Sequence, residues 1–356
     1  MCMAAKVDDL DYAVLAEDLG YSHLWVADSQ MLWSDVYATL ALIAQRTERI
    51  RIGTGVAVAP TRPAPVTAAA LATINRLAPG RVFCGIGTGN TAMRVMGHKP
   101  MSMASFEEHL TVLRPLLRGE EVELTWEGAT APTRHLMPDA GFVAFDPPVP
   151  LYVSAFGPRS LGIAARLGDG LVTSLPPEPA AVARVWERLR AAAAAVDRAI
   201  DPTSFPVTSL TTMVVLEPGE SPTSDRVRDE AGAFAISALH YAYEQWRQYG
   251  RRPGPAFQGV WDEYAAMLDE VPDERRHLRI HLGHNCWVIP EEERFVTPEL
   301  VAGTCLVGTP HDLAARLDAL HQAGLAQVML LPPLAVKEKV LEDVASRVIP
   351  LLHGIG

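Results

Sequence analysis

Short apolar runs rich in β-branched residues alternate with longer amphipathic stretches along the whole chain. Seven of these runs have the length and composition of buried strands. They cover His23–Ala27, Ile50–Val58, Arg81–Ile86, Pro150–Ser154, Gly170–Ser174, Pro206–Leu216 and Gln327–Leu331. The first residues, MCMAA, supply an eighth run. This alternation of strands and helices predicts parallel strands joined by right-handed crossovers.

The stretches between the runs carry helix signals at both ends. Apolar residues follow helical spacing from Val7 until Gly20, which is placed to end that helix. Near the C-terminus Thr309 is a predicted N-cap, Pro310 suits the first helical position and Gly324 ends the pattern. Eight such β/α units predict a closed (β/α)8 TIM barrel. The competing open, doubly wound sheet lacks the GxGxxG sequence that its first strand would carry.

Two segments interrupt the repeat. Residues 119–148 contain two alternating stretches, Val122–Trp126 and Gly141–Phe145, which predict a hairpin inserted after the fourth strand. Residues 217–298 follow the seventh strand, show helical patterns and are rich in Trp, Tyr, His and Arg. Because barrels carry their sites on the loops after the strands, we expect this long insertion to roof the active site. The chain, residues 1–356, is thus predicted to be a single barrel domain with two insertions.

Composition narrows the class of protein. The 356 residues are 49% hydrophobic and 21% charged, and 31 Lys and Arg against 42 Asp and Glu give a net charge of −11. An acidic chain without a basic run is not expected to bind nucleic acid. The four cysteines lie far apart and form no CxxC pair, so we expect buried free thiols. No apolar run approaches the roughly 18 residues of a membrane span, so we expect a cytoplasmic protein without a membrane partner.

Two glycine-containing loops are candidate phosphate sites. The first, Gly85–Asn90, ends the fourth strand with three glycines in five residues, and it suits either a ligand-binding loop or a plain turn. The second, Gly157–Ser160, follows the fifth strand and opens a helix. Its backbone N–H groups, the Ser160 hydroxyl and the Arg159 charge would meet a phosphate there, although an ordinary helix start has the same sequence.

Polar residues and glycines also mark the second and third strands. Asp28 and Ser29 end the second strand, with Asp35 just beyond, and one of the two acids is expected to cap a helix while another contacts a ligand. Gly55 and Val56 lie inside the third strand, where glycine indicates a bulge or the close approach of a ligand.

The insertion contains the sequence His281-Leu-Gly-His284. An HxxH pair suggests a metal, but no third ligand has matching spacing and Gly283 would break a helix, so no metal is predicted. The alternatives left open are a substrate-facing or proton-relaying histidine and a structural one. The sequence offers no GxSxG, P-loop or Ser/His/Asp arrangement.

Taken in register, these segments resemble the luciferase-like monooxygenase (bacterial luciferase-like) superfamily. The segments that carry the resemblance are Leu19–Asp28, Arg51–Val56, Gly80–Gly89, Ser154–Ser160, Gly168–Gly170 and Val307–Pro310. Within the superfamily, the Gly85–Gly89 loop and Pro60–Pro63 are most similar to the F420-dependent methylenetetrahydromethanopterin reductase-like branch. Ser29 departs from those deazaflavin enzymes that have His after the second-strand Asp.

The resemblance implies a barrel that binds reduced coenzyme F420, or alternatively FMN, at the carboxyl ends of its strands. It implies a non-prolyl cis peptide at Gly55-Val56 and a role for Asp28, His281 or His284 in handling the coupled proton. The cofactor-binding residues that it implies are Asp28, Ser29, Gly55, Val56, Thr88, Gly89, Asn90, Ser154, Gly157, Pro158, Arg159 and Ser160.

The function expected from the resemblance is hydride transfer from reduced F420 to a small organic substrate. One alternative is a two-component monooxygenase that takes FMNH2 from a separate flavin reductase and activates O2. The other is a flavin-binding family member without turnover. A homodimer is expected by resemblance alone. The aromatic content of residues 217–298 fits a bulky, partly apolar substrate.

Overall fold

The computed structural model describes residues 1–352 and divides the chain into two compact units. Unit 1 comprises Met1–Met93, Lys99–Thr173 and Val185–Thr208, and unit 2 comprises Arg94–His98, Ser174–Arg184 and Ser209–Gly356. The single domain expected from the sequence remains a prediction. Within residues 1–352 no helix has both the length and the apolar character needed to cross a membrane.

The main sheet has eight strands, in the order of the chain. They are β1 (Cys2–Ala4), β2 (His23–Ala27), β3 (Arg51–Val58), β4 (Val82–Gly87), β7 (Leu151–Ser154), β8 (Gly170–Thr173), β9 (Val207–Thr211) and β12 (Gln327–Leu330). The five pairs from β1–β2 to β7–β8 are all parallel. With helices between the strands, this is the predicted (β/α)8 barrel, and its insertions follow the fourth and seventh barrel strands as expected.

The helix ends predicted at Gly20, Thr309 and Gly324 are confirmed, whereas the first helix begins at Leu10 rather than at Val7. The helices between the strands are α1 (Leu10–Asp18), α2 (Val36–Arg46), α3 (Ala64–Leu77), α4 (Asn90–Arg94), α5 (Met103–Leu116), α6 (Pro158–Leu167), α7 (Pro179–Ala194), α11 (Pro310–Gln322) and α12 (Lys337–Arg347). Thr309 caps α11, because its hydroxyl accepts the N–H of Asp312 while the Asp312 carboxylate accepts the N–H of Thr309. Gly20 follows α1 with φ +82, the left-handed conformation expected after a helix end.

The insertion after β9 is helical, as predicted. It contains α8 (Asp225–Tyr249), α9 (Gln258–Asp269) and α10 (Pro298–Thr304). Short 3-10 turns complete the fold: η1 (Ala59–Thr61), η2 (Pro138–Ala140), η3 (Pro255–Phe257), η4 (Arg276–Leu278), η5 (Pro290–Phe295) and η6 (Ile349–Leu351). Buried side chains of α8, α9 and α10, among them Leu239, Tyr264 and Leu300, form one hydrophobic core. That this insertion roofs the active site remains a prediction.

Aromatic side chains fill the core of unit 1. The ring centroid of Trp25 on β2 lies 4.3 Å from that of Phe83 on β4 and 5.7 Å from that of Tyr152 on β7. A Cβ on Gly53 would overlap Phe83, and a Cβ on Gly85 would lie 2.8 Å from the Trp25 ring. These two strand glycines therefore make room for large aromatic rings.

Two strand predictions were wrong in detail. The run Pro206–Leu216 is not one strand, because after β9 a second strand, β10 (Met213–Val215), pairs in parallel with β11 (Leu306–Gly308) in a separate two-stranded sheet. The sequence showed one apolar run and no sign of the change of partner at Thr212.

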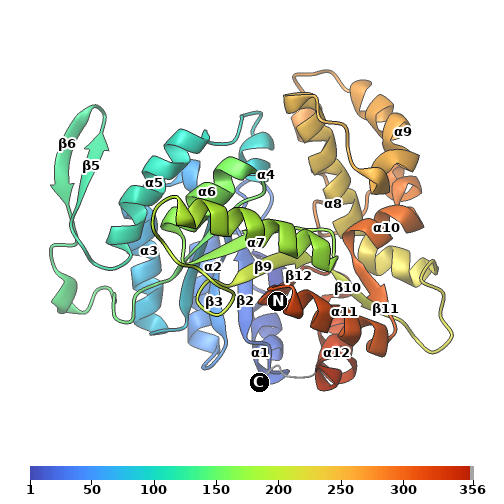
Figure 1. Ribbon diagram of the computed structural model, residues 1–356, viewed down its shortest axis with the longest axis horizontal. Helices are drawn as coiled ribbons and strands as arrows, with labels where there is room; N and C mark the ends of the chain where they lie inside the picture. The colour runs from blue at the N-terminus through green and yellow to red at the C-terminus, as the bar shows by residue number, and fades with distance from the viewer. Residues whose placement is uncertain (353–356) are drawn as a thin grey trace. The chain divides into compact units, whose positions relative to one another are not determined.

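The hairpin exists, but Gly141–Phe145 is not its second strand. Instead β5 (Val122–Trp126) pairs with β6 (Ala129–Thr133) in the antiparallel direction (Figure 1). The connecting residues Glu127 and Gly128 both have positive φ, 50 and 83, as a two-residue type I′ turn requires. The 141–145 stretch packs on the barrel instead, where the Ala144 N–H donates to the carbonyl of Ala72.

Candidate functional site

The bulge predicted in the third strand is present in β3. The Gly55–Val56 peptide bond is cis, and the register of β3 against β4 shifts between Thr54 and Ala57. The Thr54 hydroxyl donates to the carbonyl of Gly85 at 2.6 Å, which joins the two strands next to the bulge. The cis peptide expected at this position is therefore confirmed.

The strand ends meet around Gly87, the last residue of β4. A Cβ built there would lie 3.1 Å from Cγ2 of Val56, on the β3 bulge, and 3.2 Å from Cβ of Ser154, the last residue of β7. A Cβ on Gly85 would likewise lie 3.1 Å from Cγ1 of Val56. Gly85 and Gly87 thus allow the Val56 side chain of β3 to approach the β4 backbone. These glycines therefore have a role in packing, in addition to the ligand binding predicted for their loop.

The loop after β4 leads into the short helix α4. Gly89 has φ +74, and its carbonyl accepts the N–H of Met93, while the carbonyl of Thr88 accepts the N–H of Met101. Thr88, Gly89 and Asn90 are half-buried and follow directly from Gly87. They therefore lie at the same edge of the sheet as Ser154.

The N-terminus of α6 carries the second predicted loop. The Ser160 hydroxyl accepts the N–H groups of Phe156 and Gly157, at 3.2 and 3.1 Å, and donates to the Gly157 carbonyl. Within residues 1–352, the first-turn N–H groups of Arg159 and Ser160 have no hydrogen-bond partner, and the Arg159 side chain is exposed. Two free N–H groups, a guanidinium and the positive end of the helix dipole suit an anion.

A buried ion pair holds the end of β2 to the end of β3. Oδ2 of Asp28 accepts the N–H of Val58 at 3.1 Å and a hydrogen bond from Arg62 at 2.8 Å. The second guanidinium nitrogen of Arg62 donates to Asp35 at 2.7 Å. Burial raises the pKa of Asp28 against the opposing effect of Arg62. Asp28 is therefore a carboxyl whose protonation depends on its arginine partner.

The other polar residues after β2 have structural partners. Asp35 caps α2 by accepting the N–H groups of Tyr37 and Ala38, so the prediction that one acid caps a helix is confirmed. Ser29 is buried, and its carbonyl accepts the N–H groups of Leu32 and Trp33. Ser29 and Asp28 remain the predicted ring contacts of this strand end.

His281 and His284 lie in unit 2, buried and in contact with each other. Their Nδ1 atoms are 3.2 Å apart. Nε2 of His281 lies 2.9 Å from Glu244, and Nε2 of His284 lies 3.3 Å from the Tyr241 hydroxyl. Burial lowers the pKa of His284 well below its ordinary value.

A third histidine joins them that sequence spacing did not reveal. The rings of His240 on α8 and His284 are stacked, with their centroids 6.2 Å apart. Nε2 of His240 lies 3.2 Å from Oε1 of the buried Glu292. Burial lowers its pKa, although Glu292 opposes that effect. His277, one turn before His281, is not in this cluster.

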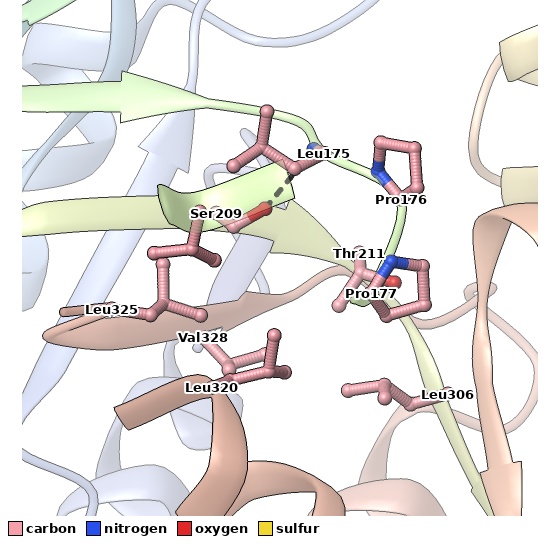
Figure 2. A pocket seen from close by; sticks show the side chains of 10 residues that line it. Leu175, Pro176, Pro177, Ser209, Thr211, Leu306, Leu320, Leu325 and Val328 are labelled. Atoms are coloured by element: carbon pink, nitrogen blue, oxygen red, sulfur yellow. Dashed lines mark hydrogen bonds between the residues drawn. The ribbon is translucent and has the colours of Figure 1, made fainter. Parts of the chain in front are cut away.

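An apolar pocket lies within unit 2, beside β9 (Figure 2). Its lining is mostly aliphatic, from Leu175, Leu320, Leu325 and Val328 among others. Its Ser209 hydroxyl accepts the N–H of Leu175, the dashed line in Figure 2. With no charged group in the lining, this pocket does not suit a phosphate.

The geometry defines the class of protein. A (β/α)8 barrel brings the ends of β3, β4 and β7 together around Gly87, with the anion-suited N-terminus of α6 directly after β7. Barrel enzymes bind their ligands at this edge of the sheet.

The chain belongs to the luciferase-like monooxygenase family, whose sequence profile matches residues 7–327. The protein is therefore an enzyme, an oxidoreductase of this family. It is 28% identical to the 5,10-methylenetetrahydromethanopterin reductase of Archaeoglobus fulgidus over 98% of this chain and 96% of the relative.

Solved structures share the fold. One is the coenzyme F420 dependent tetrahydromethanopterin reductase from Methanopyrus kandleri, with a TM-score of 0.72 and 20% identity over 99% of both chains. Another is the FMN-bound oxygenating constituent of 3,6-diketocamphane monooxygenase from Pseudomonas putida, with a TM-score of 0.60 and 18% identity over 97% of this chain and 92% of that one.

Proposed function

We propose that this protein transfers a hydride between coenzyme F420 and a small organic substrate. The observation that carries the proposal is the N-terminus of α6, where Arg159 and two backbone N–H groups lie at the carboxyl edge of the sheet. The similarity to a methylenetetrahydromethanopterin reductase over nearly the whole chain supports F420 as the cofactor.

The residues present fit a phosphate-bearing cofactor. In a chain of net charge −11, an anion needs a locally positive place, and the N-terminus of α6 with Arg159 supplies one. The proposed phosphate ligands are Gly157, Pro158, Arg159 and Ser160, with Ser154, Thr88, Gly89 and Asn90 beside them. The proposed ring contacts are Asp28 and Ser29 after β2 and Gly55 and Val56 at the β3 bulge.

Bound reduced F420 supplies the hydride, and the protein positions the ring and excludes water. Asp28 is the proposed group for the coupled proton, because its raised pKa brings its titration nearer to neutrality. His281 and His284 are less suited to that task, since both are buried and contact Glu244, Tyr241 and each other.

FMN is the second candidate cofactor. A solved monooxygenase of similar fold holds FMN, and an anion-suited helix N-terminus serves the phosphate of either cofactor. In that case a separate reductase would supply reduced FMN and O2 would be consumed. A family member without turnover would bind neither cofactor productively.

The proposed substrate is a bulky, partly apolar molecule. The proposed assembly is a homodimer, and light scattering of the purified protein measures the mass that tests it.

Substitution of Arg159 tests the proposed phosphate site. A charge-assisted hydrogen bond contributes about 1.5–3 kcal/mol, and exposure of Arg159 places the expected loss near the lower limit, about tenfold in Kd. We therefore expect Arg159→Ala to weaken F420 binding about tenfold in a fluorescence titration. Arg188→Ala, at an exposed arginine of α7, is the matched control and should bind as the wild type does. Equal affinities of the two variants would contradict the proposed site.

A further inference from the structure

Three buried histidines of unit 2 bring ring nitrogens together. One nitrogen each of His240, His281 and His284 lies within 4.8 Å of the other two. His240 comes from α8, whereas His281 and His284 come from the irregular segment after η4. All three side chains are almost completely buried. The cluster therefore joins a long helix to a segment that has little regular structure of its own.

The outer contacts determine which ring nitrogens carry hydrogen. Nε2 of His281 lies 2.9 Å from Glu244, and Nε2 of His240 lies 3.2 Å from Glu292. Each carboxylate also lies near an arginine: Arg94 is 3.3 Å from Glu244, and Arg279 is 3.6 Å from Glu292. A carboxylate oxygen accepts hydrogen bonds, so the arrangement in which each Nε2–H donates to its carboxylate satisfies both contacts. In neutral imidazoles the two Nδ1 atoms are then lone-pair acceptors.

One ring nitrogen inside the cluster consequently is an acceptor without a donor. Nδ1 of His240 has no hydrogen-bond partner within residues 1–352, although it is buried. Nδ1 of His281 and Nδ1 of His284 face each other at 3.2 Å. A buried acceptor without a donor is unfavourable. A cation between the rings would satisfy Nδ1 of His240 and lie beside the Nδ1 atoms of His281 and His284.

We propose that His240, His281 and His284 bind a divalent transition-metal ion, Zn²⁺ first among them. Imidazole nitrogen is a preferred zinc ligand, and Zn–N distances of about 2.0–2.1 Å in a tetrahedral site separate the nitrogens by about 3.3 Å. The Nδ1 atoms of His281 and His284 already have nearly that separation. The widest separation, 4.8 Å, requires one ring to turn inward on binding.

The surroundings have the organisation typical of metal sites. Histidine ligands usually donate their second ring nitrogen to a carboxylate, which orients the ring and increases its basicity. Here the Glu292 carboxylate lies against Nε2 of His240 and the Glu244 carboxylate against Nε2 of His281, while the Tyr241 hydroxyl lies 3.3 Å from Nε2 of His284. Burial lowers the pKa values of His240 and His284, which favours the neutral form that a metal binds. Three protein ligands leave the fourth position for water or another small ligand.

Metal binding is measurable without cofactor or substrate. The full-length protein, stripped with a chelator and dialysed, is titrated with Zn²⁺ in competition with a chromophoric chelator, and separately with Co²⁺. We expect one Zn²⁺ per chain at micromolar concentration or below, a rise in Tm, and the visible absorption of tetrahedral Co²⁺. His240→Gln and His284→Gln should each lower the affinity at least about 100-fold. His277→Gln, in the same segment but outside the cluster, is the matched control and should bind as the wild type does.

The wild-type titration tests the proposed metal site even where a variant does not fold. No zinc bound at 100 µM would overturn the proposal, and so would variants that bind as tightly as the wild type. Glu292→Gln adds a check within the folded site: the accepting carboxylate is lost while the volume is kept, and the affinity should fall by about 10- to 100-fold. Because none of these measurements involves F420 or FMN, their failure leaves the proposed function untouched, and the reverse also holds.

Discussion

Removal of Arg62 should lower the free energy of unfolding, because Arg62 forms a buried ion pair with Asp28 that joins the ends of β2 and β3. The side chains of Asp28 and Arg62 are 3% and 21% exposed, and their hydrogen bond is 2.8 Å long. Arg62→Met leaves Asp28 buried with only the Val58 N–H as donor. Breaking a buried pair costs about 3–5 kcal/mol, and the partial exposure of Arg62 reduces the expected loss of unfolding free energy to about 2–3 kcal/mol.

The stability loss caused by Arg62→Met should also depend on pH, in a direction that follows from the pKa of Asp28. Burial already raises the pKa of Asp28, and the loss of Arg62 should raise it further. A carboxyl whose pKa is higher in the folded state than in the unfolded one takes up its proton in the folded protein first. It contributes stability at low pH, which is lost as the pH rises through the folded-state pKa. The deficit of Arg62→Met relative to the wild type should therefore be largest at pH 8 and shrink as the pH falls.

Urea unfolding at pH 8 and at pH 5.5 measures both effects. The matched control is Arg46→Met, because Arg46 pairs with Asp11 at 2.7 Å on the surface, where the side chains are 51% and 92% exposed. That variant should lose less than about 1 kcal/mol at either pH. In the double variant Asp28→Asn/Arg62→Met, the loss should fall short of the sum of the single losses by about 1–2 kcal/mol. Equal losses for Arg62→Met and Arg46→Met, or a deficit independent of pH, would refute the reasoning.

Two further predictions concern packing and a buried carboxylate. Gly87→Ala should cost about 1–2 kcal/mol of unfolding free energy by overpacking, because its Cβ would lie 3.1 Å from Val56. Gly259→Ala, in α9 with no atom near the new Cβ, should be neutral or stabilising by up to about 1 kcal/mol, and urea midpoints compare the two variants. Hydrogen bonds from the N–H groups of Glu48–Ile50 lower the pKa of Glu17 against the opposing effect of burial. Glu17→Gln should thus lose about 1–2 kcal/mol of unfolding free energy at pH 7. The difference from the wild type should disappear as the pH falls below 4.5, the ordinary pKa of a Glu carboxyl. A difference that does not change with pH would contradict the explanation.

The fold was predictable because its signals are local. Each barrel strand is a short apolar run between helical stretches, and even the short β1 was visible in the first five residues. Helix ends such as Thr309 and Gly20 carry side-chain or backbone preferences that depend on a few neighbours.

Pairing between strands was harder to predict because it depends on partners far away in the chain. Gly141–Phe145 has the stronger alternation, yet β5 pairs with Ala129–Thr133, which contains Pro132 and small residues. The turn at Glu127 and Gly128 determines that choice, because a two-residue loop brings the nearer segment into register. The run that became β9 and β10 likewise showed no sign that β11 would be the partner of its second half.

Part of the candidate site was also open to sequence reasoning. The positions of Asp28, Arg159 and Ser160 at strand and helix ends, and of Gly55 inside the third strand, follow from the alternation of elements. His240 does not, because it lies 41 residues before His281, and only the folding of α8 onto the later segment brings the two together. Tertiary structure thus brings a third histidine beside the HxxH pair that sequence spacing does not reveal.

Titration of the purified wild-type protein with F420 and with FMN tests the central claim most directly. Binding is followed by the fluorescence of each cofactor, and O2 uptake is recorded after reduction. The account predicts saturable binding of F420 at micromolar concentration, FMN binding at least about tenfold weaker, and no O2 uptake beyond that of the free reduced cofactor. Tight FMN binding with rapid O2 uptake, or no binding of F420, would contradict it.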